Sequence, residues 1–79
     1  MRVRVVPYAE LRRLLPARHE ELWLEVPEGA TVGDALRILG LVTEERLIIG
    51  LDGRYATPDT PLHTDAELTL VTPMMGGTT

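Results

Sequence analysis

PEGATVGDALRILGL, residues 27–41, is the stretch that decides the fold of this sequence. Its Pro-Glu-Gly start turns the chain, and Thr31 then stands as the N-cap of a helix, with Asp34 three residues later in a capping-box position. Gly40 follows the last apolar residue as a natural C-cap. The apolar residues between them recur at helical spacing: Val32, Ala35, Leu36 and Leu39. The stretch therefore predicts one well-formed helix that buries a single face.

Strand patterns flank this helix on both sides. Apolar and polar residues alternate or form short apolar runs in the segments before and after it, which is typical of half-buried strands. Asp52-Gly53 is a hairpin turn signal between two of these segments. The expected strands cover residues 1–6, 22–26, 47–51, 54–56 and 68–71.

The order of the elements favours an α+β domain. Pro7 ends the first strand, and a short helix is expected over residues 8–15, which Pro16 stops. A helix between the first two strands argues against a simple meander, and the main helix between later strands fits a mixed four- to five-stranded sheet wrapped around it. We expect one domain over residues 1–73 and a tail over residues 74–79, because MMGGTT cannot pack as an element.

Composition excludes several classes of function. The 79 residues carry a net charge of −4, with no cysteine and no lysine. Disulfides, thiolate metal sites, a cysteine nucleophile and a lysine Schiff base are therefore excluded. An acidic domain without a basic block is a poor nucleic-acid binder and suits a basic protein partner better. A domain this small has little room for a deep substrate cavity, so we expect function at the surface or at an end.

Other sequence features favour a cytoplasmic protein without a metal site. His19 and His63 lie apart in polar stretches and lack the spacing of metal ligands. No N-terminal run resembles a signal peptide, and no stretch approaches the length of a membrane span. We expect neither nucleic acid nor membrane as a partner.

Three segments together resemble one family. Residues 26–41 resemble the loop and helix of the MoaD/ThiS-type sulfur carriers, residues 51–73 resemble their second half, and Gly76-Gly77 resembles their diglycine tail. The resemblance implies a ubiquitin-like β-grasp fold. It also implies a protein that is the substrate of enzymes and is not itself an enzyme.

The resemblance assigns the chemistry to the tail. In such families an activating enzyme adenylates the terminal glycine carboxylate with ATP, a sulfurtransferase converts it to a thiocarboxylate, and a downstream synthase takes the sulfur. Gly76 and Gly77 give the slim chain that threads into a narrow enzyme site. Pro73 stiffens the exit from the sheet, and Met74 and Met75 suit an uneven apolar groove on a partner. No cofactor is expected on the carrier, since ATP belongs to the activating enzyme.

One departure from the family pattern affects the expected chemistry. The printed sequence continues past the diglycine with Thr78-Thr79, and a β-branched threonine fits a channel shaped for glycine badly. Either a processing protease removes Thr78 and Thr79, or this protein is not activated; we expect the protease. Molybdopterin or tungstopterin synthesis, thiamine synthesis and tRNA thiolation all use carriers of this shape, and the sequence leaves the choice open.

Strand alternation also predicts a docking face beside the tail. It directs Ile48 and Val71 outward on their strands, and Val6 shares the outward parity of Arg2 and Arg4. Neighbouring strands would bring the three aliphatic residues into one exposed patch, with the two arginines near its edge. The alternative interpretation is a non-catalytic β-grasp module, similar to the TGS domains, that docks on partners without using the diglycine.

Overall fold

The computed structural model describes residues 1–16, 19–41 and 47–72. In this part of the chain it contains five strands, one α-helix and one short 3₁₀ helix. In chain order these are β1 (Arg2–Pro7), η1 (Ala9–Leu14), β2 (Leu22–Glu25), α1 (Val32–Leu39), β3 (Ile48–Leu51), β4 (Arg54–Tyr55) and β5 (Glu67–Val71). The expected α+β order is confirmed, and each predicted strand is present within a residue or two of its expected bounds.

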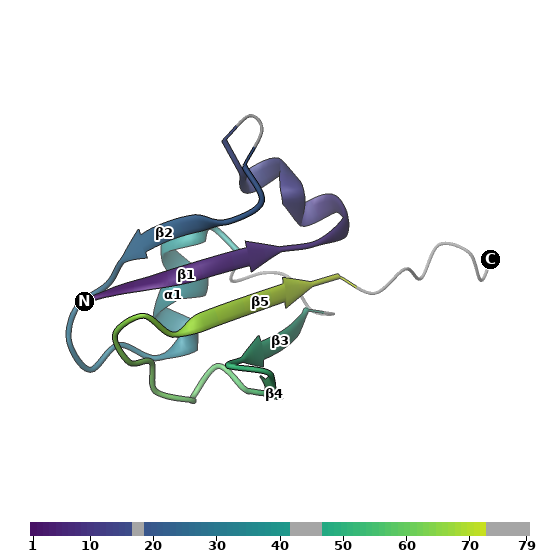
Figure 1. The fold of residues 1–79 in the computed structure, drawn as a ribbon. Helices are drawn as coiled ribbons and strands as arrows, with labels where there is room; N and C mark the ends of the chain where they lie inside the picture. Colours follow the sequence, from purple (N-terminus) through teal and green to yellow (C-terminus); the bar gives the residue numbers. More distant parts are fainter. Residues whose placement is uncertain (17–18, 42–46, 73–79) are drawn as a thin grey trace.

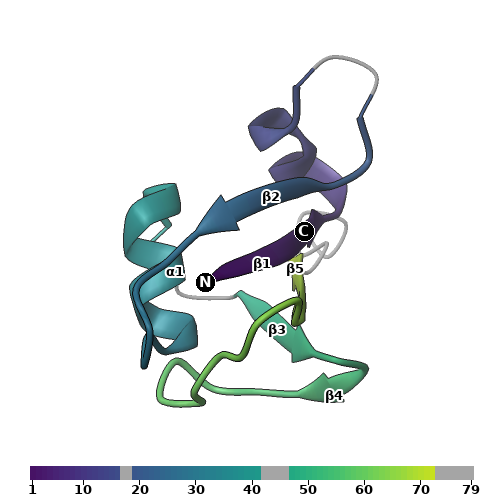
Figure 2. The ribbon, with the colours of Figure 1, turned by 60° about the vertical axis from the view of Figure 1, so that its left-hand side comes forward.

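The strands form one mixed sheet in the order β2-β1-β5-β3-β4. Strands β1 and β5 lie side by side and pair in parallel, with Val5 opposite Leu68. Every other pair of neighbouring strands is antiparallel. Figures 1 and 2 show α1 packed on one face of this sheet. The expected mixed sheet around one main helix is therefore confirmed.

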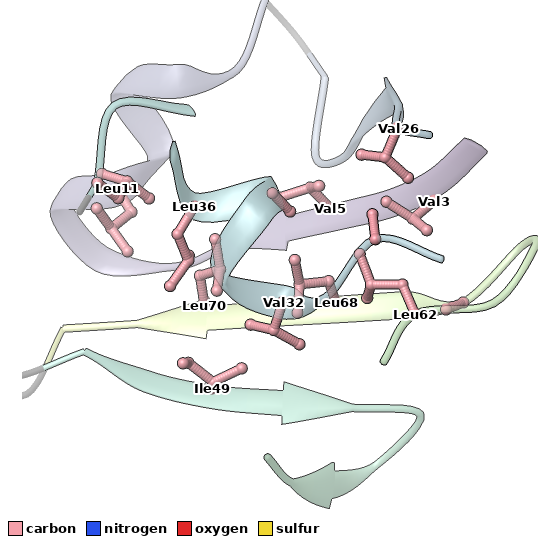
Figure 3. Close-up of a cluster of buried hydrophobic side chains, with 14 residues drawn as sticks. Val3, Val5, Leu11, Val26, Val32, Leu36, Ile49, Leu62, Leu68 and Leu70 are labelled. Atoms are coloured by element: carbon pink, nitrogen blue, oxygen red, sulfur yellow. The ribbon is translucent and has the colours of Figure 1, made fainter. Parts of the chain in front are cut away.

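The core lies between the sheet and α1. Side chains of alternate residues point into it, and Val5, Leu68 and Leu70 are fully shielded from solvent. Val32 and Leu36 of α1 complete the same buried cluster (Figure 3). Each buried aliphatic side chain of this size contributes about 1.5–3 kcal/mol relative to its exposed state. Ile49 is also buried, whereas its neighbour Ile48 is 40% exposed, so the predicted inward and outward parities of β3 are correct.

The two ends of α1 have the predicted caps. The Thr31 amide donates to Asp34 Oδ2 at 2.9 Å, and the Asp34 amide donates to Thr31 Oγ1 at 3.4 Å, which completes a capping box. Gly40 ends the helix in the left-handed region at φ 78°, where a side chain would be strained. Hydrogen bonds from the Thr31 amide and from Arg37 hold the pKa of the Asp34 carboxyl below its ordinary value.

The predicted short helix after β1 is present as a 3₁₀ helix, because only six residues, Ala9–Leu14, separate the turn at Tyr8 from the loop leading to Pro16. The ring of Trp23 in β2 lies beneath the Arg2 guanidinium, 4.3 Å from the guanidinium carbon to the ring centroid.

The capping box gives a first testable prediction. Thr31→Ala removes the side-chain acceptor at the helix start and should lower the free energy of unfolding by about 1 kcal/mol, as measured by urea denaturation. Thr31→Ser keeps the hydroxyl and serves as the control, with a midpoint close to that of the parent. Equal loss in both variants would contradict a role for the hydroxyl.

Candidate functional site

The candidate site begins with the sheet face that points away from α1. Val6 of β1 lies opposite Thr69 of β5, and Ile48 of β3 lies opposite Val71 of β5. Val6 and Val71 are partly exposed and Ile48 is 40% exposed. We call Val6, Ile48 and Val71 the outer patch. The structure thus brings the three predicted aliphatic residues onto one face of three adjacent strands, β1, β5 and β3.

The outer patch lies at the end of the last strand. Val71 is the final residue of β5, so the chain leaves the sheet from within the patch. Five predicted tail residues lie outside the described part of the chain: Pro73, Met74, Met75, Gly76 and Gly77. Their roles, and the division between residues 1–73 and 74–79, stay predictions.

The two predicted arginines lie on the same face, toward β2. Arg2 stacks on Trp23, and its Nε is 3.7 Å from a carboxylate oxygen of Asp65. Arg4 lies between two acidic side chains, with nitrogen–oxygen distances of 3.6 Å to both Glu21 and Glu67. Both guanidinium groups thus have acidic neighbours within the molecule. Their predicted contact with a partner stays a prediction.

A second feature, which sequence reasoning missed, joins the β3–β4 hairpin to the start of β5. Asp52 occupies the turn at φ 52°; its Oδ1 accepts from the Glu67 amide at 2.9 Å, and its Oδ2 is 2.5 Å from His63 Nε2. His63 Nδ1 is 3.0 Å from the Thr64 carbonyl oxygen. Carboxylate and carbonyl oxygens are acceptors, so the doubly protonated imidazolium satisfies both contacts. We call Asp52 and His63 the hairpin clasp.

The hairpin clasp shifts the pKa values of both partners. The hydrogen bond to Asp52 raises the pKa of His63 above 6.5, and the bond from the Glu67 amide, followed by that from His63, lowers the pKa of Asp52 below 3.8. The residues are eleven apart in sequence and lie on two different segments, the β3–β4 turn and the loop before β5, which only the fold brings together. For this reason, sequence patterns alone gave no signal of the pair.

Other kinds of site can be checked in the described ranges. Within residues 1–16, 19–41 and 47–72, no group of three or more His, Asp or Glu side chains is arranged to hold a metal ion. None of the helices in these ranges is long and apolar enough to cross a membrane.

Comparison of the sequence with known families decides the assignment. The sequence profile of the ThiS family matches residues 5–77. The chain belongs to the ThiS family. Comparison of this ThiS-family chain with curated protein sequences finds no match.

Solved structures share the fold of this chain. The ThiS-family chain is similar to SAMP1 from Haloferax volcanii, with a TM-score of 0.78 and 22% identity over 98% of this chain and 100% of that one. It is similar to the putative molybdopterin converting factor, subunit 1, from Pyrococcus furiosus, with a TM-score of 0.74 and 25% identity over 92% and 98% of the two chains. It also resembles a chain in the complex of subunits 1 and 2 of the molybdopterin-converting factor from Helicobacter pylori, with a TM-score of 0.63 and 20% identity over 98% and 100%.

These findings confirm the MoaD/ThiS-type, ubiquitin-like β-grasp fold. The mixed sheet with one helix on one face is the arrangement shared with these neighbours. The family match and the structural neighbours thus give this chain the fold of the ThiS/MoaD-type sulfur carriers and ubiquitin-like modifiers.

The hairpin clasp gives a prediction for the dependence of stability on pH. Because the folded pKa of His63 is raised, its stabilisation is complete below about pH 6.5 and is lost as pH rises through the folded pKa. The folded pKa of Asp52 is lowered, so its contribution is complete above about pH 3.8 and is lost as pH falls through that lowered value. The clasp is therefore strongest between these limits.

Urea denaturation of the parent and of His63→Gln tests this window. The difference in free energy of unfolding between the two should be largest at about pH 5.5 and should shrink by about pH 9. A difference that stays constant over this range would contradict the ionic character of the clasp.

Proposed function

We propose that this ThiS-family chain is a cytoplasmic sulfur carrier that works through the carboxyl group of Gly77. After a protease removes Thr78 and Thr79, an activating enzyme adenylates Gly77 and a sulfurtransferase converts it to a thiocarboxylate. The observation that carries the proposal is the extent of the family match, which runs through both glycines and stops at residue 77. The chain is in this role a protein substrate, and its partners supply the catalysis.

The chemistry requires a terminal glycine that an enzyme can enclose. A carboxylate is a poor electrophile, so one of its oxygens first attacks the α-phosphorus of ATP and displaces pyrophosphate. Sulfide supplied by the sulfurtransferase then attacks the carbonyl carbon of the acyl-adenylate, AMP leaves, and the new carbon–sulfur bond makes the thiocarboxylate. Glycine has no Cβ, so the Gly76-Gly77 segment adopts extended conformations in a channel too narrow for other residues.

The fold supports this role by where it directs the chain. β5 is held on both sides by β1 and β3, which fixes the point from which the tail departs. The outer patch surrounds that point, so a partner that binds the patch is positioned to receive the tail. Apolar residues exposed together on a small acidic domain fit a protein interface.

Similarity to two solved proteins favours the molybdopterin branch among the three candidate pathways. The Pyrococcus furiosus neighbour is described as a putative molybdopterin converting factor subunit, and the Helicobacter pylori neighbour is in complex with subunit 2 of that factor. A synthase-type partner is therefore the downstream acceptor that we propose. The likeness to SAMP1, a small archaeal modifier protein, favours a second candidate function, in which the activated Gly77 is attached to other proteins.

Activation of Gly77 is the direct test. A chain ending at Gly77, incubated with its purified activating enzyme and ATP, should release pyrophosphate and form an adenylate, whereas the chain ending at Thr79 should not. Addition of the sulfur donor should then give the mass increase of one oxygen replaced by sulfur. A chain ending at Gly76 is the control. If the chain ending at Gly77 forms no adenylate, the carrier function is wrong. If the chain becomes covalently attached to other proteins through Gly77, that result would favour the second candidate function, a protein modifier.

The outer patch gives a separate prediction. Ile48→Asp places a charge within the patch and should weaken binding of the activating enzyme by at least about tenfold, since a charge without a partner is costly to bury in an apolar interface. The fold should persist because Ile48 points to solvent. Ile38→Asp is the matched control: Ile38 is 53% exposed on α1, away from the sheet. Calorimetric titration measures the affinity, and equal affinities for the two variants would contradict the patch.

A further inference from the structure

Gly50 occupies a position on the outer face where neither the backbone nor the packing calls for glycine. It lies in β3 opposite Thr69 on one side and Tyr55 on the other, and its φ is outside the left-handed region. A Cβ built there would meet Thr69 Cβ at 3.5 Å and the Arg54 carbonyl oxygen at 3.7 Å, which are ordinary contact distances. Glycine inside a strand weakens it and often marks a place where another molecule approaches closely.

The missing side chain leaves a hollow in the outer face. The hollow has a volume of about 350 Å³. Its lining residues come from β3, β4, the turn between them and β5: Ile48, Ile49, Gly50, Gly53, Arg54, Tyr55, Thr69 and Val71. An apolar cavity of about 150 Å³ is enough to bind a benzene ring. The hollow therefore has room for one large apolar side chain, and it is open to solvent beside the outer patch.

The charge at the rim indicates what accompanies that side chain. Arg54 is exposed and lines the hollow, and within the described residues it has no carboxylate within ion-pair distance. Arg2 and Arg4, on the other half of the same face, have such neighbours. The uncompensated positive charge on this face thus lies at the hollow, where a carboxylate of a partner would complement it.

We propose that Gly50 forms the floor of a socket that receives one leucine- or aromatic-sized side chain of the activating enzyme, with a carboxylate beside it that pairs with Arg54. The inference rests on the proposed function for the identity of the partner. The socket opens next to Ile48 and Val71, so an enzyme that holds the tail where it leaves β5 reaches the socket at the same time. Gly50 is then a specificity-determining position, because any larger residue fills the space that the partner needs.

Substitutions at Gly50 separate binding from folding. Gly50→Val fills the socket, while a β-branched residue suits the strand, so its thermal unfolding midpoint should equal or exceed that of the parent. Its affinity for the purified activating enzyme, measured by calorimetric titration of the full chain, should fall at least about tenfold, equivalent to about 1.4 kcal/mol. Gly50→Ala adds only a Cβ and should give a smaller loss. Ile38→Val, on the exposed side of α1 and outside the hollow, is the control and should bind with the affinity of the parent.

A change of charge tests the rim. Arg54→Glu should weaken binding, and the loss should shrink as salt is added, whereas Arg54→Lys should bind nearly as well as the parent. An Arg54→Glu variant with the affinity of the parent would overturn the carboxylate part of the proposal.

Three results would overturn the socket. The first is a folded Gly50→Val chain with the affinity of the parent. The second is a gain in affinity, which would mean that the chain's own C-terminal residues occupy the socket in the free protein. The third is a parent chain that the activating enzyme does not bind. Adenylation of a chain ending at Gly77 is measured separately from binding. If the enzyme binds this chain without adenylating it, the carrier function is wrong. The affinities of the Gly50 variants still test the socket in that case.

Discussion

The parallel pairing of β1 with β5 is the constraint on which the rest of the structure depends. It joins the first strand of the domain to the last, with Val5 opposite Leu68 at the centre of the sheet. Alternate residues of these two strands provide the fully buried side chains that α1 covers. Without this pairing, the sheet would separate into two antiparallel pieces that share no core. One piece would contain β1 and β2, and the other would contain β3, β4 and β5.

The same strands that build the core also build the outer face. Because side chains of a strand alternate between its two faces, each inward residue of β5 has an outward neighbour, and Leu70 and Val71 show this directly. The packing on α1 thereby fixes the position of the outer patch and of the point where the chain leaves the sheet. A rigid sheet with its apolar surface at this exit suits a protein whose proposed chemistry lies in its tail.

Most of the fold followed from local patterns, whereas several contacts on the surface did not. The capping box at Thr31 and Asp34, the αL cap at Gly40 and the parities of β3 each depend on residues within one turn or one strand, so spacing alone predicts them. Contacts such as Asp52–His63 depend on how distant segments meet, and no periodicity reports that. The chemistry of the tail came from resemblance, because two glycines alone have no distinctive pattern.

The parallel β1–β5 pairing has a consequence for biosynthesis. The centre of the sheet can assemble only after the ribosome has synthesised the chain through Leu70. The hydrophobic residues of β1 therefore lack their β5 partner during most of translation. A prematurely terminated product that lacks β5 would keep these aliphatic side chains exposed and would be a target for chaperones and proteases. Quality control would thus tend to remove shortened products before they compete with intact chains for partners.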